Sequence, residues 1–519
     1  MRTRTTPLAA VLTLVLAAGA ASAQGPVPPP EGAADAWTVP ATPAPAPISA
    51  EEHARRRAAL ARRMGDGVLV ILGAEEPEAD YMTFAQSSPF RYFTGVTEPG
   101  AALVMAKQGE SVREILFVLP RDPSREVWEG SRLGAERAQA LTGIPARTTR
   151  ALEPTLDSLL ARQKQLFMIS PLTSDGGSSE YLRPDQEFAA ALARKHAGLQ
   201  ARWLDDQAFA LRAVKSPAEL ALLRRAIYVT VLAQRQAMLA VEPGMNEFEI
   251  HALIEGTFRR HGAERPGFGS IVGSGPNSTT LHYRSADRFM QAGETLVMDI
   301  GASYRGYTAD VTRTVPVSGR FTPEQRQVYE IVLAAQKAAE AQARPGANLG
   351  TLSGTALRVI AEGLARLGLI ESPTATYECD RGQCPQFYLY YMHGLGHGIG
   401  LDVHDPEPAY PAYGGRFVVG SAFTIEPGIY VRSDVLDYLS DTPANRALKA
   451  KLGPAVRRYA NIGVRIEDDY FITGNGVERV SEGAPREIAE IEALMARDGH
   501  WNRDRRPGVV EWYRGTSPR

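Results

Sequence analysis

The sequence predicts two folded domains, an α/β domain followed by an α+β domain. Short apolar runs alternate with helical patterns over residues 51–206. From residue 217 onward, long helical segments are segregated from glycine-rich, strand-like segments, which is typical of an α+β domain. The 519 residues are 44% hydrophobic and 22% charged, an ordinary globular composition. The net charge of −2, with both signs interleaved, gives no indication of a nucleic-acid partner.

The first 50 residues are predicted to lie outside the fold. In residues 1–23, two arginines precede an apolar stretch and the small-residue site Ala21-Ser22-Ala23, the pattern of a signal peptide. The alternative, a retained anchor, is disfavoured because the apolar stretch is short for a membrane span. Residues 24–50 are rich in Pro and Ala and predict an extended tether. We expect export, with cleavage near Ala23 and a periplasmic or secreted product without a stable membrane anchor.

The first domain is predicted to span residues 51–206, followed by a linker over 207–216. Within it, 68–72 and 115–119 are continuous apolar runs, as in buried strands. No cluster of metal-ligating or nucleophilic residues occurs in this part of the sequence. We therefore expect the domain to have a structural role or a role in substrate access.

The second domain is predicted to span residues 217–498, with a C-terminal tail over 499–519. Ser216 can cap a helix, Pro217 suits its first position, and Glu219 completes a capping box. The remainder to about residue 472 reads mostly as strands and glycine-rich turns. The sequence predicts helices over 217–241, 246–261, 323–343 and 349–367.

Four carboxylates and one histidine in this domain sit in short apolar or glycine-rich frames. A carboxylate within a strand-like apolar run is costly to bury unless a cation meets it. Four carboxylates and two divalent ions would balance in charge, whereas an empty site would hold four repelling anions. One imidazole among oxygen ligands favours Mn²⁺ or a similar ion over a thiolate-type zinc site. The predicted metal ligands are Asp299, Asp310, His397, Glu426 and Glu467.

The spacing of Asp299 and Asp310 predicts a hairpin that turns at Arg305-Gly306. In that register Asp310 lies opposite Gly301, and the two aspartates are diagonal neighbours on one face, with Cβ atoms roughly 7–8 Å apart or less. Such a pair can hold two metals roughly 3.5–4 Å apart. The alternative is a pair of exposed strand carboxylates, which their apolar flanks disfavour.

Three of the nine histidines, His393, His397 and His404, fall within twelve residues. Histidines at i and i+4 suggest a zinc-binding helix, but glycine at every second position from 394 to 400 costs about 1 kcal/mol each in a helix. An extended strand or tight loop fits better, with the glycines letting the backbone approach metals or substrate. A structural role for any one of the histidines remains the alternative.

Cys379 and Cys384 are the only cysteines and flank a polar loop. Export would permit a disulfide between them, which would pin the loop rather than stabilise the whole fold. Two free thiols or a metal site are the alternatives, although further zinc ligands are lacking nearby.

These frames resemble the aminopeptidase P family of pita-bread metallopeptidases. The resemblance also covers the segments 88–99, 121–123 and 128–134 of the first domain and the junction 211–217. It implies a creatinase-like α/β N-terminal domain followed by an α+β pita-bread catalytic domain. Two segments depart from the family pattern, 376–390 and 433–459, which leaves the preferred substrate length open.

The resemblance also implies a role for each site residue. Asp299 would hold one metal, His397 and Glu426 the other, and Asp310 and Glu467 would bridge the two. The remaining catalytic residues implied are His282, His393, His404 and, beside the last ligand, Arg465. Trp128 matches an aromatic residue that reaches a neighbouring subunit's site, so a homo-oligomer, dimer or tetramer, is expected.

The implied reaction is hydrolysis of the bond between an N-terminal residue and a following proline by a metal-bridging hydroxide, with peptides as substrates and Glu426 managing the proton. An Xaa-Pro dipeptidase (prolidase) is the nearest alternative. A pita-bread domain that has lost its metals and become a binding protein is another, which the presence of all five ligands disfavours.

Overall fold

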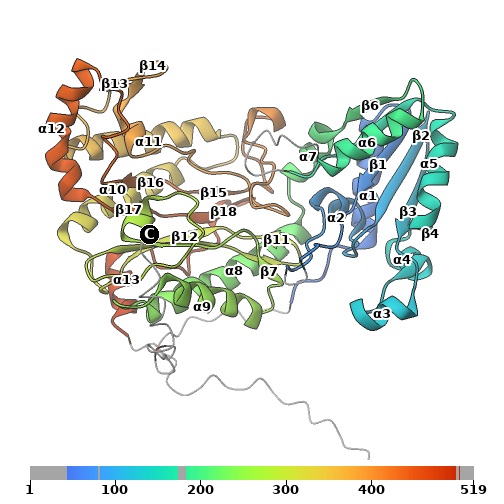
Figure 1. Cartoon of the computed structure of the whole chain (residues 1–519), viewed down its shortest axis with the longest axis horizontal. Helices are drawn as coiled ribbons and strands as arrows, with labels where there is room; N and C mark the ends of the chain where they lie inside the picture. Colours follow the sequence, from blue (N-terminus) through green and yellow to red (C-terminus); the bar gives the residue numbers. More distant parts are fainter. Residues whose placement is uncertain (1–43, 80–81, 173–182, 498–501, 503–519) are drawn as a thin grey trace, which may run out of the picture.

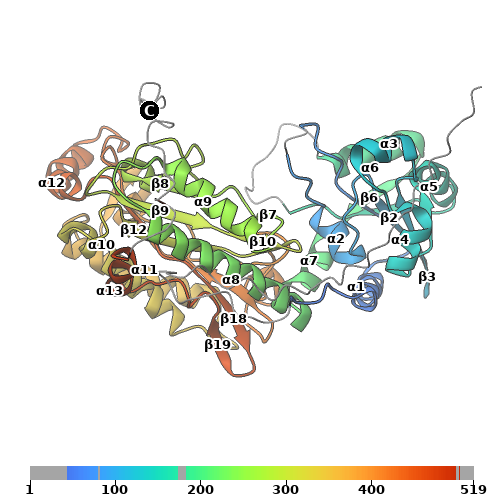
Figure 2. The ribbon, with the colours of Figure 1, turned by 90° about the horizontal axis from the view of Figure 1, so that it is seen from below.

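The computed structural model describes residues 44–79, 82–172, 183–497 and 502. The predicted signal peptide lies outside these residues, as do residues 24–43 of the predicted tether and all of the predicted C-terminal tail except residue 502. The described residues form two lobes, the N-terminal one drawn in blue to teal and the C-terminal one in green to red (Figure 1, Figure 2). No helix in the described ranges is long and apolar enough to cross a membrane.

The N-terminal domain is built on one six-stranded sheet in the order β4-β3-β2-β1-β5-β6. Strand β1 runs antiparallel to β2 and parallel to β5, so the sheet is mixed. Both predicted apolar runs form strands, β1 and β3, and most of the apolar residues of these strands are buried. The strands are β1 (Gly67–Leu72), β2 (Ala102–Gln108), β3 (Ser111–Val118), β4 (Ala146–Thr148), β5 (Gln165–Met168) and β6 (Gln200–Trp203). The helices are α1 (Ala50–Arg63), α2 (Ser88–Thr94), α3 (Pro123–Glu129), α4 (Gly134–Thr142), α5 (Leu152–Leu160) and α6 (Pro184–Lys195).

The junction between the domains is more ordered than predicted. Helix α7 (Asp205–Ala213) occupies most of the predicted linker 207–216. Tertiary contacts hold this helix: Tyr92 Oη donates to the carbonyl of Leu211 at 2.8 Å, and the side chain of Arg212 is buried. The next helix, α8 (Pro217–Ala240), begins with the predicted capping box.

The C-terminal domain places its strands between two helical pairs. Helices α8 and α9 (Glu247–Arg260) contact the strands of its first half, whereas α10 (Pro323–Glu340) contacts β15, β16 and β17 and packs on α11 (Leu349–Arg366). The strands of the first half are β7 (Arg265–Pro266), β8 (Ile271–Ser274), β9 (Thr295–Ile300), β10 (Ala302–Tyr304), β11 (Tyr307–Thr308) and β12 (Val311–Pro316). The strands of the second half are β15 (Ala422–Ile425), β16 (Gly428–Val431), β17 (Ile462–Arg465), β18 (Asp468–Thr473) and β19 (Gly476–Arg479).

The prediction that the part up to about residue 472 is mostly strands and turns was wrong for one helix, α12 (Pro443–Tyr459). A further helix, α13 (Ile488–Met495), lies beyond that part. Helix α12 contains Pro454, which argues against a helix in the sequence. Tertiary packing overrides that signal because the apolar face of α12, including Leu448, Leu452 and Val456, is buried.

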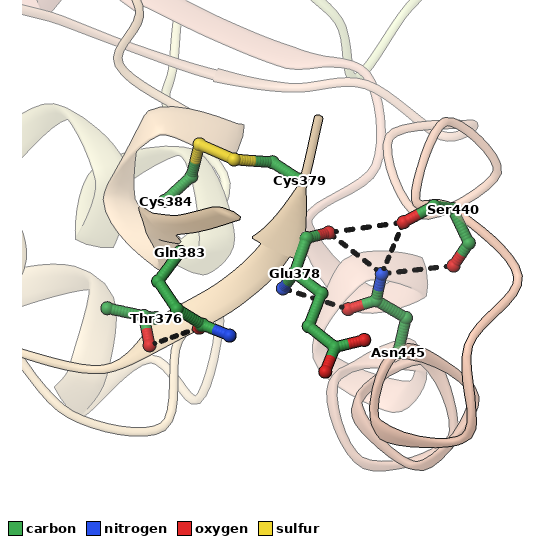
Figure 3. Close-up of a disulfide and its surroundings, with 7 residues drawn as sticks. All are labelled: Thr376, Glu378, Cys379, Gln383, Cys384, Ser440 and Asn445. Atoms are coloured by element: carbon green, nitrogen blue, oxygen red, sulfur yellow. Dashed lines mark hydrogen bonds between the residues drawn. A yellow bond between two sulfur atoms is a disulfide. The ribbon is translucent and has the colours of Figure 1, made fainter. Parts of the chain in front are cut away.

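The cysteines form the predicted disulfide, which closes the hairpin of β13 (Thr376–Cys379) and β14 (Gly382–Pro385) (Figure 3). Asn445 of α12 accepts a hydrogen bond from the backbone N–H of Glu378 and donates to its carbonyl at 2.9 Å. The same side-chain amide donates to Ser440 (Figure 3). The two segments that depart from the family pattern therefore pack against each other.

Candidate metal centre

Asp299 and Asp310 come together through the predicted hairpin. Asp299 lies in β9, and Asp310 immediately precedes β12. The hairpin turns at Arg305-Gly306, both with positive φ, and the register of β9 and β12 puts Asp310 opposite Gly301. The predicted diagonal arrangement is confirmed, and both carboxylates are buried rather than exposed.

The other three predicted ligands reach the same point from the second half of the domain. Glu426 directly follows β15, and Glu467 lies between β17 and β18. His397 Nε2 lies 3.4 Å from Glu426 Oε1, 3.5 Å from Asp310 Oδ2 and 3.9 Å from Glu467 Oε1. Ligand atoms of Asp310, His397 and Glu467 all lie within 4.8 Å of one another. The structure thus brings one imidazole and the carboxylates into one cluster.

The donor set fits divalent cations. Asp299 Oδ1, Asp310 Oδ1 and Glu467 Oε1 are buried and have no hydrogen-bond partner among the described residues. Buried polar atoms are normally satisfied, so unpaired carboxylate oxygens that converge indicate a missing positive ligand. Oxygen donors with a single imidazole suit hard ions such as Mn²⁺. The residues therefore fit the predicted pair of metal ions.

The pKa shifts of the clustered residues also fit a site for cations. Burial raises the pKa of Asp310 and Glu467 well above their usual values, and neighbouring carboxylates add to both shifts. Burial raises the pKa of Glu426 to about 8, although Arg465 opposes the shift. Burial lowers the pKa of His397 to about 3. Without a cation the site therefore favours neutral carboxyl groups and a neutral imidazole, the forms that minimise buried charge.

Residues outside the predicted ligand set form hydrogen bonds with the predicted ligands. Thr312 Oγ1 donates to Glu467 Oε2 at 2.7 Å, and the N–H of Asp310 donates to Asp469 Oδ2 at 3.1 Å. Arg313 is fully buried and donates to the carbonyl of Glu467 at 2.6 Å. Thr312 is the last residue of the predicted frame 307–312 around Asp310, and Arg313 follows it, so their position in a buried strand was the available signal.

Asp468 and Asp469 directly follow the predicted ligand Glu467, and both are fully buried. Asp468 Oδ1 accepts hydrogen bonds from Arg313 Nη2 and Ser481 Oγ, each at 2.6 Å. Together with the contact between Asp469 and Asp310, these bonds show that both aspartates support the ligand-bearing strands.

A cavity of about 330 Å³ opens over the ligands. His282, His393, His404 and Arg465 line it, as predicted from the family resemblance. Arg465 Nη2 lies 3.4 Å from Asp299 Oδ2 and donates to the carbonyl of Leu281 at 3.0 Å, next to His282. All residues that line this cavity belong to the C-terminal domain.

The loop that carries His282 depends on a residue that the sequence analysis missed, Glu247. This carboxylate is fully buried at the start of α9. It accepts hydrogen bonds from Ser274 N and Oγ at 2.6 and 2.7 Å and from Tyr283 Oη at 2.8 Å. It also accepts from the N–H of Arg288 at 3.1 Å. Glu247 therefore joins both ends of the His282 loop.

As predicted, the histidine segment is not a helix; it is a loop in which Gly398 forms isolated bridges to Asp405 and Phe423. A Cβ on Gly396 would lie 2.1 Å from the carbonyl oxygen of Thr424 in β15. A Cβ on Gly398 would lie 2.3 Å from the carbonyl oxygen of Asp405, and one on Gly400 would lie 2.5 Å from the carboxylate of Asp405. These glycines therefore permit close approach to neighbouring protein segments. Gly394 and Gly396 also line the cavity, and the expected approach to metals or substrate stays a prediction.

Trp128 lies outside this cavity. It is 87% exposed on α3, which lies at the lower edge of the N-terminal domain in Figure 1. Within one chain, therefore, this residue does not contribute to the site.

Comparison with known proteins agrees with this site. Residues 221–474 match metallopeptidase family M24, and residues 53–167 match the aminopeptidase P N-terminal domain. The Xaa-Pro aminopeptidase of Escherichia coli (strain K12) is 33% identical over 464 residues, which cover 86% of this chain and 98% of that protein. The human Xaa-Pro aminopeptidase 3 is 32% identical over 428 residues, 80% of this chain and 77% of that protein.

Solved structures show the same similarity. Proline aminopeptidase P II from Yersinia pestis superposes with a TM-score of 0.72 at 32% identity, covering 86% of this chain and all of that one. The Glu383Ala variant of Escherichia coli aminopeptidase P, solved with substrate, gives a TM-score of 0.71 at 32% identity over 87% of this chain and 99% of that one.

Fold, ligand cluster and comparisons together define a metal-dependent peptidase, with a creatinase-like α/β domain followed by a pita-bread domain. Both parts of the predicted fold are thereby confirmed. The chain belongs to the aminopeptidase P family.

Proposed function

We propose that this protein is an Xaa-Pro aminopeptidase, which removes the N-terminal residue from peptides with proline at the second position. The observation that carries the proposal is the cluster of buried, unpaired carboxylate oxygens around His397. The cluster lies in a chain that spans nearly the full length of a relative named Xaa-Pro aminopeptidase.

The ligand cluster would hold two divalent ions, with Mn²⁺ the expected metal. Asp299 would hold one ion, His397 and Glu426 the other, and Asp310 and Glu467 both. When bound, such a pair supplies a hydroxide nucleophile near neutral pH and polarises the scissile carbonyl group.

Side chains around the cavity would orient the peptide and move protons. His393 Nδ1 lies 3.9 Å from Glu426 Oε2, while its Nε2 is 2.8 Å from Tyr430 Oη. Burial lowers the pKa of His393 to about 3, so this imidazole is neutral at physiological pH. Glu426 would accept a proton during attack and return it to the leaving proline nitrogen. His282 and His404 face the cavity and would bind the carbonyl oxygen of the peptide.

The test is hydrolysis of three peptides by the mature protein, with Mn²⁺ and with a chelator. The peptides are an Xaa-Pro dipeptide, an Xaa-Pro-Xaa tripeptide and an Xaa-Ala-Xaa control. Cleavage of the tripeptide at the Xaa-Pro bond, lost in chelator, is the expected result. Cleavage of the dipeptide alone would identify a prolidase. Metal binding without cleavage would refute the proposed specificity, and absence of bound metal would indicate a binding protein.

We also propose that the protein is exported. The support is the pattern of residues 1–23, a basic start, an apolar stretch and a small-residue cleavage site. Expression of the full-length chain in a Gram-negative host, followed by fractionation and intact-mass measurement, tests this proposal. A periplasmic or secreted product that begins at Gln24 is expected, whereas a cytoplasmic product that keeps Met1 or Arg2 would contradict it.

Self-association is a further proposal. Helix α3 exposes 81% of Val127 and 87% of Trp128, an unusual pair of apolar side chains for a free surface. We expect light scattering after size exclusion to give a dimer or tetramer, and Trp128→Ala to weaken it. A monomer at micromolar concentration would refute this proposal.

A further inference from the structure

His404 lies on a tight turn that is pinned at its base. The N–H of Asp405 donates to the carbonyl of Gly398 at 2.7 Å, and the N–H of Gly400 donates to the carbonyl of Asp402 at 3.1 Å. The N–H of Asp402 in turn donates to Asp405 Oδ1 at 3.2 Å. The two aspartates therefore flank His404 and define the shape of its turn.

The ring of His404 depends on this turn for its place over the metal ligands. Its centroid lies 4.0 Å from that of His397, with the planes tilted by 38°. A shift of the turn would therefore move His404 relative to the ligand and the cavity.

Groups from outside the C-terminal domain hold both aspartates. Ser88 Oγ, at the start of α2, donates to Asp402 Oδ2 at 2.6 Å. Arg212 Nη2, on α7, donates to the same oxygen at 2.6 Å and also to Asp405 Oδ1. Its Nη1 donates to Ser88 Oγ at 3.2 Å, which closes a ring of bonds between the two domains.

Lys215, in the short connection after α7, adds a second cation to this ring of bonds. Its Nζ lies 3.3 Å from Asp405 Oδ2 and donates to the carbonyl of Pro406 at 2.7 Å. The side chains of Arg212, Lys215 and Asp405 are at most 2% exposed. Two buried cations thus meet two anions, and loss of one anion would leave Arg212 with a single charged partner.

We propose that Asp402 and Asp405 are positioning residues, through which the N-terminal domain and the α7 junction hold His404 over the metal centre. This inference rests on the proposed function, because it assigns His404 a place in peptide hydrolysis. It gives the N-terminal domain a part in catalysis although that domain contributes no residue to the cavity. A purely structural ion pair would stabilise the two-domain assembly without any dependence on His404.

The test is a double-mutant cycle between Asp402→Asn and His404→Ala in the full mature chain with Mn²⁺. Asp402→Asn keeps the shape of the side chain and removes its charge. We expect it to lower kcat for the Xaa-Pro-Xaa tripeptide about tenfold, because small misplacements of catalytic groups have large effects on rate. In the His404→Ala background the same change should have no further effect. An equal loss in both backgrounds would overturn the proposal.

Two further variants serve as a milder test and as a control for the double-mutant cycle. Ser88→Ala removes one hydrogen bond to Asp402 without a change of charge, and we expect a smaller loss of kcat in the same direction. It replaces Asp402→Asn in the cycle if that variant does not fold. Glu478→Gln is the control for loss of charge, because it breaks a more exposed ion pair with Arg224 that lies away from the cavity. We expect its kcat to stay within about twofold of the parent value.

A readout independent of turnover separates this proposal from the proposed function. In the full-length mature chain with ¹³C-labelled histidine and Mg²⁺, Asp402→Asn should shift or broaden the ring signals of His404 and His397. The signals of His53 and His251 should not change. Unchanged His404 signals would overturn the positioning role, even if the wild-type protein cleaves Xaa-Pro peptides. A failure to cleave such peptides, with shifted His404 signals, would overturn the proposed function alone.

Discussion

Two adjacent acidic residues, Glu467 and Asp468, belong to two clusters in which the pKa of the buried acid is shifted in opposite directions. Both side chains are at most 1% exposed. Burial opposes ionisation of Asp468, but Arg313, Arg479 and Arg486 outweigh it and lower its pKa. Glu467 faces other carboxylates, and burial together with their charge raises its pKa well above the usual value. The protein therefore surrounds Asp468, which supports the fold, with three arginines, whereas Glu467 lies mainly among other carboxylates and Arg465 offsets their effect only in part.

The largest effect should come from removal of a metal ligand. Asp310→Asn takes away one carboxylate that we assign to both ions, and we expect kcat/KM to fall by more than about 100-fold, because changes to residues that merely support ligands already cost 10–100-fold. Metal content by mass spectrometry should fall in parallel. In chelator, the variant should melt higher than the parent, because one buried unpaired acid is gone. Equal metal content and activity would show that the cluster is not the metal centre.

A large loss of stability is expected when the cluster of arginines around Asp468 is broken. Arg313→Met leaves Asp468 with weaker partners in a dry interior, and we expect the free energy of unfolding to fall by about 3–5 kcal/mol. The matched control, Arg224→Met, removes an exposed ion pair with Glu478 and should cost about 1 kcal/mol or less. Urea unfolding followed by circular dichroism measures both. Equal losses would mean that Asp468 does not need its arginines.

The contrast also predicts how stability depends on pH without metal. The folded pKa values of Asp310, Glu426 and Glu467 lie above their unfolded values, so the folded state keeps protons that the unfolded chain has released. The free energy of unfolding of the chelated protein should therefore fall as pH rises between 6.5 and 8.

The buried histidines do not cancel this trend. The folded pKa of His393 and His397 is about 3, so their effect is a loss of stability as pH falls below 6.5. Urea titrations at pH 6.5, 7.2 and 8, with chelator and with Mn²⁺, test the prediction. A slope that is the same with and without metal would contradict it.

The smallest effect is expected at the disulfide hairpin, which lies apart from both clusters. Replacement of Cys379 and Cys384 by alanine should lower the melting temperature by a few degrees, because a loop this short gains little from closure. We expect kcat to stay within about twofold, since the hairpin contacts α12 rather than the cavity lining. A large loss of activity would show that the hairpin also shapes the site.

Much of the site could be predicted because its chemistry is local in the sequence. The frames around Asp299 and Asp310 contain both the apolar flanks that bury the acids and the Arg305-Gly306 turn that sets their register. Glu247 could not be predicted in this way. A glutamate in the first turn of a helix is ordinary, and only the folded loop shows that it collects hydrogen bonds from Ser274, Tyr283 and Arg288.

The helices of the C-terminal domain show the same difference between features that the local sequence predicts and features that depend on tertiary contacts. The start of α8 follows from Ser216, Pro217 and Glu219, whose capping interactions are made within one turn. Helix α12 was missed because Pro454 is a strong local signal against a helix. Burial of its apolar face outweighs that signal, and burial depends on segments distant in the sequence.

By itself, the sequence determined the order of the two domains, and it predicted the five candidate ligands and the hairpin that joins two of them. These features depend on periodicity, turn chemistry and the cost of burying a charge. All three can be judged from residues that are close together in the sequence. Only the tertiary structure decided which acids receive an arginine, as Asp468 does from Arg313, and which stay unpaired. It also decided that Ser88 and Arg212 hold the turn of His404. Contacts across hundreds of residues follow from packing of the whole chain, which no local pattern encodes.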